Sequence, residues 1–368
     1  MKILIIGAGI GGLAAARALG ADGHEVVVFE RADKLRTEGA ALTLWSNGTG
    51  VLSALGVPTE GLGAPVDVLE QHSWDGKVLL RVDLAHAVRA YGHPHLSTPR
   101  RDLIQRLAVG VPVAFSRTFT GFDQDEHGVR AHFADGTTES CDLLVGADGY
   151  RSAVRGQAWG ADPARPSGWS TWQGLSAVDI EITTSRRGLM ILGPEGMVGL
   201  MPAGNGLLQW WFDLRWTHNP PPLRERFGHW ASPVDQVLDQ VRDEEMEFFP
   251  HYHFKVPKVW SSGRVTVLGD AAHTMPPTVA QGGNQALEDA WALARALREE
   301  PSDVRRALAR YERARTRRAA LTSRVASAEP ANQYRPTLSR LAPDAFLGPI
   351  YTRWLRMVST YLGTHAGR

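Results

Sequence analysis

Residues 1–12, MKILIIGAGIGG, decide the fold of this chain. Residues 2–6 form a short apolar run that predicts a buried strand, and residues 13–19 predict an alanine-rich helix. Residues 24–30, HEVVVFE, predict a second buried strand. Strand, glycine turn, helix and strand within about thirty residues make a βαβ unit, which implies parallel pairing and a right-handed crossover. A doubly wound α/β sheet therefore begins at residue 2.

The glycines between the first strand and the helix fit the pattern GxGxxG. Gly7 permits a tight turn, Gly9 admits a phosphate, and Gly12 lets helix and strand pack closely, while Gly11 belongs to the same turn. Backbone N–H groups at the helix start can then meet a pyrophosphate. A glycine turn that binds nothing is the alternative.

Glu30 closes the second strand about twenty residues after the turn, where an acid accepts from ribose hydroxyls. We expect Glu30 and the adjacent Arg31 to contact the nucleotide. FAD and NAD share this fingerprint, so it does not choose between them.

Two later motifs place an aspartate after an apolar strand. Residues 146–152, GADGYRS, carry Asp148, and residues 269–273, GDAAH, begin with Gly269 and Asp270. Both aspartates then lie at the carboxyl ends of strands, which is the ligand-facing edge of an open α/β sheet. Helix capping is the alternative for either aspartate alone.

With these three motifs in order, the sequence resembles the single-component flavin monooxygenases of the para-hydroxybenzoate hydroxylase type. The resemblance implies a Rossmann-like FAD-binding domain, with Gly269 and Asp270 at the FAD ribityl chain and Asp148 in a motif shared by FAD and NAD(P)H. Arg100 matches the arginine that opens a helix beside the flavin, with Arg101 as a competing candidate and two surface arginines as the other alternative.

Two further segments resemble the family loops that pass the flavin ring. Residues 39–48 contain Ala41, and residues 276–284 contain Gly282, Gly283 and Asn284 at the start of a helix. Ala280 stands where the family usually has glycine, and we expect this difference to alter local flexibility rather than FAD binding.

The chain divides into three parts by pattern. We expect a discontinuous FAD-binding domain (1–70, 94–164 and 263–300) with a small antiparallel insertion between residues 111 and 145. An interleaved substrate domain (71–93 and 165–262) reads as a mainly antiparallel sheet, with turns at residues 193–196 and 203–206. Residues 301–368 form a C-terminal helical segment, whose prolines at 330, 336, 343 and 349 are expected to break its end into short pieces.

Tryptophans crowd the substrate region and suit a flat apolar ligand. The candidate substrate contacts are Trp45, Trp172, Trp210, Trp211 and Pro277. Neighbouring residues of a strand point to opposite faces, so at most one of Trp210 and Trp211 can face the pocket. The layout is nearest to the urate hydroxylase branch, yet residues 207–211 are uncharged where that enzyme has an arginine. A larger, less anionic aromatic or polyketide-like substrate is expected.

Composition excludes several other classes. The 40 basic and 39 acidic residues balance to +1, so we expect neither a nucleic acid nor a membrane as partner. Cys141 is the only cysteine, which excludes an intrachain disulfide and fits a cytoplasmic protein, either a monomer or a homodimer. His251 and His253 have no third ligand nearby, so no metal is expected, and His273 is expected to order its loop.

The resemblance implies an oxidoreductase in which NAD(P)H reduces FAD and O2 forms a flavin C4a-hydroperoxide that hydroxylates or epoxidises the substrate. The cofactor carries the difficult chemistry, and we assign no catalytic side chain from sequence. The alternatives are a flavin reductase, a flavin-templated cyclase or isomerase without oxygen insertion, and a flavin-binding regulatory module.

Overall fold

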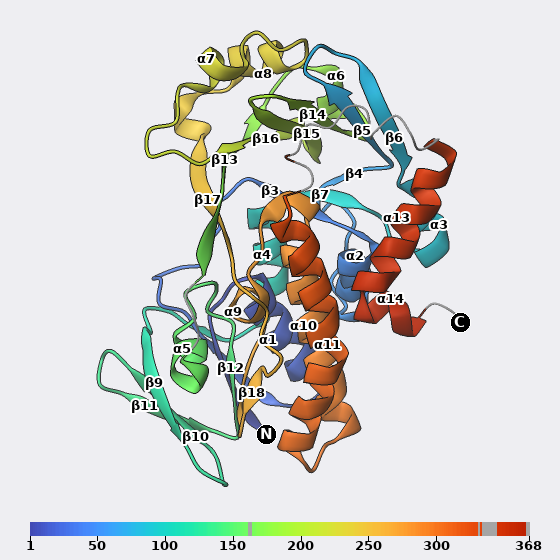
Figure 1. Ribbon diagram of the computed structural model, residues 1–368. Helices are drawn as coiled ribbons and strands as arrows, with labels where there is room; N and C mark the ends of the chain where they lie inside the picture. Colours follow the sequence, from blue (N-terminus) through green and yellow to red (C-terminus); the bar gives the residue numbers. More distant parts are fainter. Residues whose placement is uncertain (161–163, 330–331, 333–343, 366–368) are drawn as a thin grey trace.

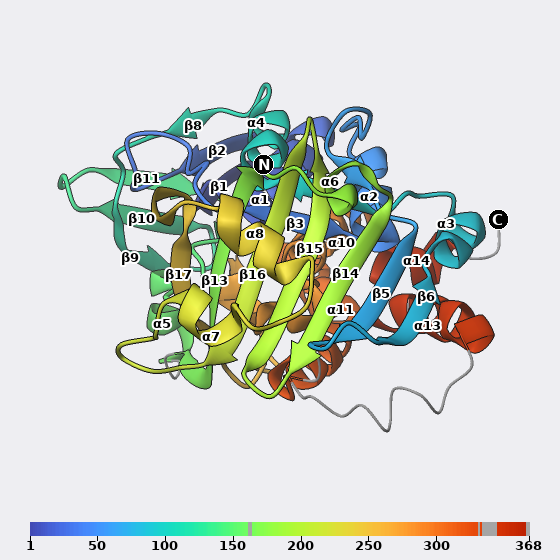
Figure 2. The same cartoon turned by 90° about the horizontal axis from the view of Figure 1, so that it is seen from above.

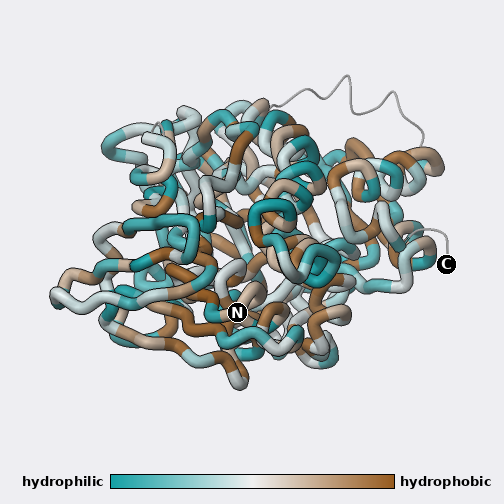
Figure 3. Tube along the Cα trace, turned by 90° about the horizontal axis from the view of Figure 1, so that it is seen from below, coloured by the Kyte–Doolittle hydropathy of each residue, from teal (hydrophilic) through white to brown (hydrophobic). Residues whose placement is uncertain are grey.

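The computed structural model describes residues 1–160, 164–329, 332 and 344–365. A six-stranded sheet lies at one end and a seven-stranded sheet at the other, with long C-terminal helices alongside both (Figure 1). None of the described helices is long and apolar enough to cross a membrane. In Figure 3 the chain alternates repeatedly between hydrophobic and hydrophilic residues along its helices.

The six-stranded sheet confirms the predicted βαβ unit. β1 (Lys2–Ile6) pairs in parallel with β2 (Glu25–Phe29) on one side and with β12 (Leu143–Gly146) on the other, and α1 (Ile10–Ala21) connects β1 to β2. β8 (Val113–Ala114), β19 (Val265–Val267) and the antiparallel edge strand β18 (Ser261–Ser262) complete the order β18-β19-β12-β1-β2-β8. The central strands β1 and β12 are nearly continuous apolar runs because helices cover the sheet.

Two small antiparallel sheets flank this core. The predicted insertion is a sheet of β9 (Phe119–Gln124), β10 (Val129–Phe133) and β11 (Thr138–Cys141). A second sheet, of β3 (Ala41–Leu44), β7 (Leu96–Pro99) and β4 (Ala64–Pro65), was not expected. β7 also packs against β15 of the large sheet, so this second sheet joins the two ends of the molecule.

The seven-stranded sheet crosses the molecule as a broad layer (Figure 2). In spatial order its strands are β17 (Glu247–His253), β13 (Arg165–Ala177), β16 (Leu207–Arg215), β15 (Gly196–Gly204), β14 (Arg187–Gly193), β5 (Val68–Ser73) and β6 (Val78–Asp83). Neighbours are antiparallel except β14 and β5. The expected turns at 193–196 and 203–206 connect β14 to β15 and β15 to β16.

Each face of the large sheet has a different neighbour. The outer face packs under α6 (Glu181–Thr184), α7 (Leu223–Phe227) and α8 (Val234–Gln240) through an apolar cluster that includes Trp210 and Trp230. The other face points toward the dinucleotide end. This face of every strand except β6 contributes to the lining of a cavity between the two ends.

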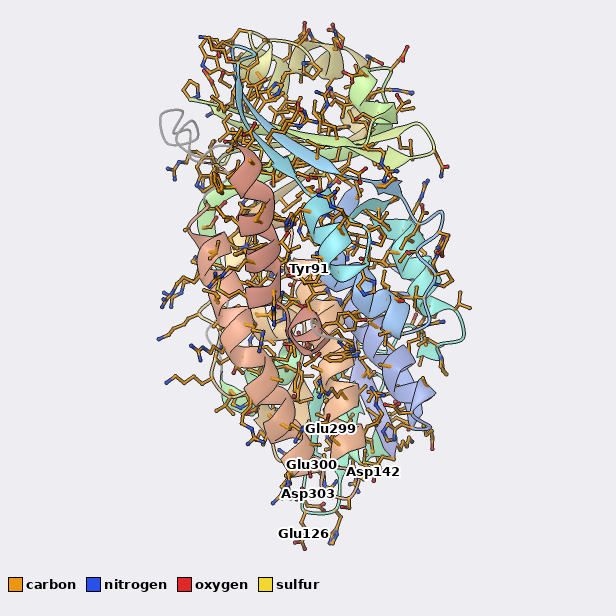
Figure 4. All side chains as sticks on the ribbon, turned by 90° about the vertical axis from the view of Figure 1, so that its right-hand side faces the viewer. Tyr91, Glu126, Asp142, Glu299, Glu300 and Asp303 are labelled. Carbon is orange, nitrogen blue, oxygen red and sulfur yellow. The ribbon has the colours of Figure 1, made fainter. Side chains whose placement is uncertain are left out.

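The other helices run beneath and beside the sheets. They are α2 (Ser46–Ala54), α3 (Ala85–Tyr91), α4 (Arg100–Ala108), α5 (Ala153–Trp159), α9 (Asp270–His273), α10 (Gly282–Glu299), α11 (Val304–Ser327), α13 (Asp344–Val358), α14 (Thr360–His365), and the 3-10 helices η1 (Asp243–Glu245) and η2 (Pro277–Val279). The helix predicted to start near Asn284 is confirmed as α10, and α11 lies within the predicted C-terminal helical segment. Figure 4 shows Glu299, Glu300 and Asp303 at the turn between them, far from the large sheet.

The expectation that Pro349 breaks the tail was wrong. Pro349 lies inside α13 and has no backbone N–H, so the helix loses one hydrogen bond there. Its ring is exposed to solvent and does not clash with a packed neighbour. Contacts to α3 hold α13 in place, including the Tyr91 hydroxyl, which donates to the Thr352 carbonyl at 2.8 Å (Figure 4). The prolines at 330, 336 and 343 lie outside the described residues.

Candidate active site

The glycine turn after β1 divides its roles as expected. Gly7 has φ +107°, and a Cβ there would lie 2.4 Å from the Ala147 carbonyl oxygen. A Cβ on Gly12 would lie 1.9 Å from the Gly7 carbonyl oxygen, whereas one on Gly9 would meet nothing within 4 Å. α1 begins just after Gly9 without a side-chain cap, and Gly9 and Gly11 line a cavity. Free N–H groups and open space at a helix start fit a pyrophosphate.

Glu30 stands directly after β2, beside this turn. Its carboxylate accepts from the Ala8 N–H at 2.9 Å and from the Ala32 N–H at 3.0 Å, and only 8% of the residue is exposed. A carboxylate has about four acceptor positions, so both oxygens can still receive ribose hydroxyls. Arg31 is exposed and is not among the residues that line the cavity.

The cavity has a volume of about 620 Å³ and lies between the two sheets and α13. Besides Gly9 and Gly11, nine of the predicted residues line it: Ala41, Trp45, Arg100, Trp211, Gly269, Asp270, Pro277, Gly282 and Gly283. The large sheet adds residues such as Met201 and Phe249, and α13 adds Tyr351 and Trp354. An adjoining cleft of about 810 Å³, beside the loop at 32–42, shares Arg100 and Gly283 with it.

The large sheet sorts its tryptophans by alternation. Trp211 and Gln173 line the cavity, whereas Trp210 and Trp172 point to the opposite face and pack in the outer apolar cluster. Trp210 is fully buried, and its indole N–H donates to the Ser176 hydroxyl at 3.0 Å. Of these three tryptophans, Trp211 therefore lies at the cavity, and Trp172 and Trp210 lie away from it.

Asn284 serves the start of α10. Its side-chain oxygen accepts from the Trp45 N–H at 3.0 Å, and its amide donates to the carbonyls of Thr43 at 2.9 Å and Ala280 at 2.7 Å. This fully buried side chain holds β3, the loop and α10 together. The N–H groups at the start of α10 have no acidic residue in the first turn to occupy them, and they begin at the cavity.

Asp148 has one occupied and one open carboxylate oxygen. One oxygen accepts from the N–H groups of Ala153 at 2.8 Å and Val154 at 3.2 Å, which opens α5. The other is buried without a protein partner, and burial raises the pKa of this carboxyl. A buried acceptor beside Gly149, which lines the cavity, fits a hydroxyl of a bound cofactor.

A buried charged network supports the Gly269 loop. Asp289 accepts from the Gly269 N–H at 2.9 Å and lies 2.6 Å from the His273 ring and 2.6 Å from Arg315. Burial opposes ionisation, but His273 and Arg315 together hold the pKa of Asp289 below its ordinary value. His273 thus orders its loop, in agreement with the expectation.

Comparisons with known proteins agree with this geometry. The FAD binding domain family matches residues 1–326. The chain belongs to this family. It is 34% identical over 343 residues to the FAD-dependent urate hydroxylase of Mycolicibacterium vanbaalenii, covering 87% of this chain and 85% of the relative. It is 35% identical over 334 residues to 3-amino-4-hydroxybenzoate 2-monooxygenase PtnB3 of Streptomyces platensis, covering 85% and 84%.

A solved structure extends the likeness to the whole fold. Klebsiella pneumoniae HpxO complexed with FAD and uric acid aligns with a TM-score of 0.85 and 28% identity, covering 98% of this chain and 97% of that one. The chain is thus an FAD-dependent oxidoreductase of the class A flavin monooxygenase group, which confirms the predicted family and α/β fold. Its cofactor is FAD, with NAD(P)H as the reductant typical of the family.

Asp213 is among the cavity residues of this flavoprotein that sequence reasoning missed. Asp213 lies on the cavity face of β16, is 1% exposed, and contacts Thr171 of β13. Burial raises the pKa of its carboxyl to about 6. The signal was available, because an acid stands two residues after Trp211 in an otherwise uncharged run.

His251 belongs to this group of buried polar side chains. Its Nε2 lies 2.6 Å from the Thr171 hydroxyl and its Nδ1 lies 3.1 Å from Glu329, while His253 contacts Ser327. Within the described part of the chain, no group of three or more possible metal ligands comes together.

Proposed function

We propose that this chain hydroxylates an aromatic small molecule, using NAD(P)H and O2. The single observation that carries the proposal is the shared cavity: the FAD-side loops at Gly9, Gly269 and Gly282 and the sheet face at Trp211 and Phe249 line the same space. Bound FAD supplies transfer of one oxygen atom after reduction. The chain binds FAD and substrate in one cavity, and α13 lines one side of it.

The walls support an aromatic substrate with little negative charge. β16 presents Trp211 and Gln209 to the cavity, and the Gln209 amide is already paired, donating to the Ala41 carbonyl at 2.9 Å and accepting from Ser97 at 3.1 Å. Among the described lining residues, Arg100 is the single cation. Relatives are named for urate and for 3-amino-4-hydroxybenzoate. A neutral, hydroxylated aromatic fits this lining better than urate.

The test is a turnover assay on the purified FAD-loaded protein. NADH or NADPH oxidation is followed with urate, 3-amino-4-hydroxybenzoate and a panel of neutral aromatic alcohols, and products are weighed by mass spectrometry. Stimulated oxidation with a gain of one oxygen atom supports the proposal. A gain of two hydrogens indicates a reductase, an unchanged mass in a rearranged product indicates an isomerase, and no stimulation by the panel contradicts the proposal.

Two further properties stay predictions. A cytoplasmic location is proposed from Cys141, the only cysteine of the chain. This residue is buried, and burial raises the pKa of its thiol to about 11, so the thiol is a poor nucleophile. A monomer or homodimer is also proposed, and light scattering of the purified protein will distinguish the two.

A further inference from the structure

A line of buried polar side chains runs from the cavity into the protein on the large sheet. Asp213 and Thr171 lie directly opposite each other on β16 and β13, and both line the cavity. His251 of β17 and Glu329, just after α11, continue the line, and these four residues are between 1% and 4% exposed. Nothing in the flavin chemistry above uses these four groups.

The number of protons on each group determines which atom donates in each hydrogen bond along this line. The Thr171 hydroxyl donates its one proton to Asp213, so it must accept from the Nε2–H of His251 at 2.6 Å. The other ring nitrogen of His251 lies 3.1 Å from Glu329, which also accepts from the Ser167 hydroxyl at 2.6 Å. When Asp213 is ionised, the Thr171 hydroxyl thus points its proton at a carboxylate that lines the cavity.

The groups facing Asp213 set its ionisation. Burial raises the pKa of Asp213, and the Glu329 carboxylate raises it further, while His251, Thr171 and Asn332 lower it, for a value of about 6. At neutral pH a carboxyl with this pKa is mostly ionised yet basic enough to take a proton, which is the property of an effective general base.

We propose that Asp213 is the general base for a hydroxyl group on the aromatic substrate. The substrate O–H bond breaks, an O–H bond forms on the Asp213 carboxylate, and the electron pair stays on the substrate oxygen, which makes the ring electron-rich before oxygen is transferred. Thr171 and His251 are positioning residues that orient Asp213 and favour its charge. The inference rests on the proposed function, since it requires an aromatic alcohol in the cavity.

The first test measures binding without turnover. Oxidised, FAD-loaded protein is dialysed to equilibrium against 2-naphthol or its methyl ether, 2-methoxynaphthalene, between pH 5 and pH 7.5. The hydroxyl can donate to ionised Asp213, so the dissociation constant of naphthol should fall about tenfold as pH rises through 6. The methyl ether has no such proton, and its affinity should not change with pH.

Variants assign this pH dependence to Asp213. Asp213→Asn should bind naphthol with a flat pH profile. Thr171→Val removes a hydrogen bond that favours the charged form, so the profile should move up by about one pH unit, and Thr171→Ser should restore it. Asp123→Asn, on the exposed surface of β9, is the matched control and should behave as the unmodified protein. FAD content and melting temperature verify that each variant is folded.

The second test measures the chemical step with any aromatic alcohol that supports turnover. Product formation should rise with pH around 6, and Asp213→Asn should lower kcat by about a hundredfold or more. The inference is overturned if Asp213→Asn keeps the pH dependence of naphthol binding, if the methyl ether shows the same dependence, or if neither naphthalene binds. Binding that behaves as expected in a protein that never inserts oxygen would contradict the proposed function and leave Asp213 as the acceptor.

Discussion

Asp213 should lower the stability of the protein at neutral pH. Its folded-state pKa is about 6, above the ordinary 3.8, so its stabilising contribution is complete below about pH 4 and is lost as pH rises through 6. A shift of about two pKa units corresponds to about 3 kcal/mol. We therefore expect Asp213→Asn to melt higher than the unmodified protein at pH 7.5 and to lose most of that advantage at pH 4.5. A difference in melting temperature that is constant with pH would contradict this.

Glu30 should matter for FAD affinity. Glu30→Ala removes a charge-assisted acceptor worth about 1.5 to 3 kcal/mol, which lowers FAD affinity at least about tenfold. Because Glu30 also accepts from two backbone N–H groups, Glu30→Gln, which keeps one acceptor, should lose less. Glu25→Ala is the control, because Glu25 is exposed on β2, the strand that precedes Glu30. FAD remaining after dialysis is the measurement, and equal retention in Glu30→Ala would remove this residue from the site.

The residues that were predictable from sequence are those whose roles depend on neighbours in the same turn. Gly7, Gly9 and Gly12 are fixed by local sterics, so their pattern was sufficient. The Asp213 group depends instead on partners brought together by three strands and the segment after α11. Thr171 and His251 are 80 residues apart in sequence, and His251 and Glu329 are 78 apart. No local pattern connects such residues.

At the scale of elements, β16 separates a structural tryptophan from a functional one. Trp210→Ala should destabilise the fold by about 3 to 5 kcal/mol, the usual cost of an aromatic cavity. Trp211→Ala should raise the dissociation constant of an aromatic ligand with little change in melting temperature or FAD content, because this ring lines the cavity. Chemical denaturation and ligand titration measure the two effects. Equal instability of both variants with unchanged ligand affinity would refute the assignment.

α10 should influence the flavin through its positive end. A carboxylate introduced at this helix start destabilises the reduced, negatively charged flavin by about 1 kcal/mol. The reduction potential of the two-electron flavin couple then falls by roughly 20 mV. A Cβ on Gly283 would approach Leu42 at 3.0 Å, whereas one on Gly282 has open space. Gly282→Asp is therefore the cleaner variant and Gly282→Asn its control. Redox titration with full FAD occupancy and an unshifted potential would show that this end does not face the ring.

Elements with strong periodicity were predictable, and tertiary support explains the exceptions. The apolar runs of the six-stranded sheet and the apolar stripes of α10 and α11 are visible in the local sequence pattern. α13 continues through Pro349 because α3 and β6 hold it, and β3, β4 and β7 are too short to stand out in the sequence. The element types followed from local pattern, whereas the packing of short elements did not.

At the scale of the whole molecule, no sequence motif indicated how the cavity is closed. Tyr351 and Trp354 come from α13, beyond the motifs that carry the family resemblance. Tyr351 lies against Trp45, just before α2, and Trp354 lies against Tyr351. The cavity therefore depends on C-terminal helices being held firmly against the FAD-binding sheet. Arg315 of α11 is the residue placed to do this.

Arg315 connects three helices from a fully buried position. It donates to Glu288 at 2.8 Å, to Asp289 at 2.6 Å and to Thr360 of α14 at 2.9 Å. Arg315→Met leaves two buried carboxylates without their cation, so we expect a loss of about 3 to 5 kcal/mol in unfolding free energy and weaker FAD retention, since Asp289 also holds the Gly269 loop. Adding Asp289→Asn should recover part of the stability by removing one unpaired charge.

The control is Arg295→Ala, which breaks an exposed ion pair with Glu299 on α10 and should cost less than about 1 kcal/mol. Urea denaturation will compare the variants, and an Arg315→Met protein as stable as Arg295→Ala would show that this network does not hold the helices together.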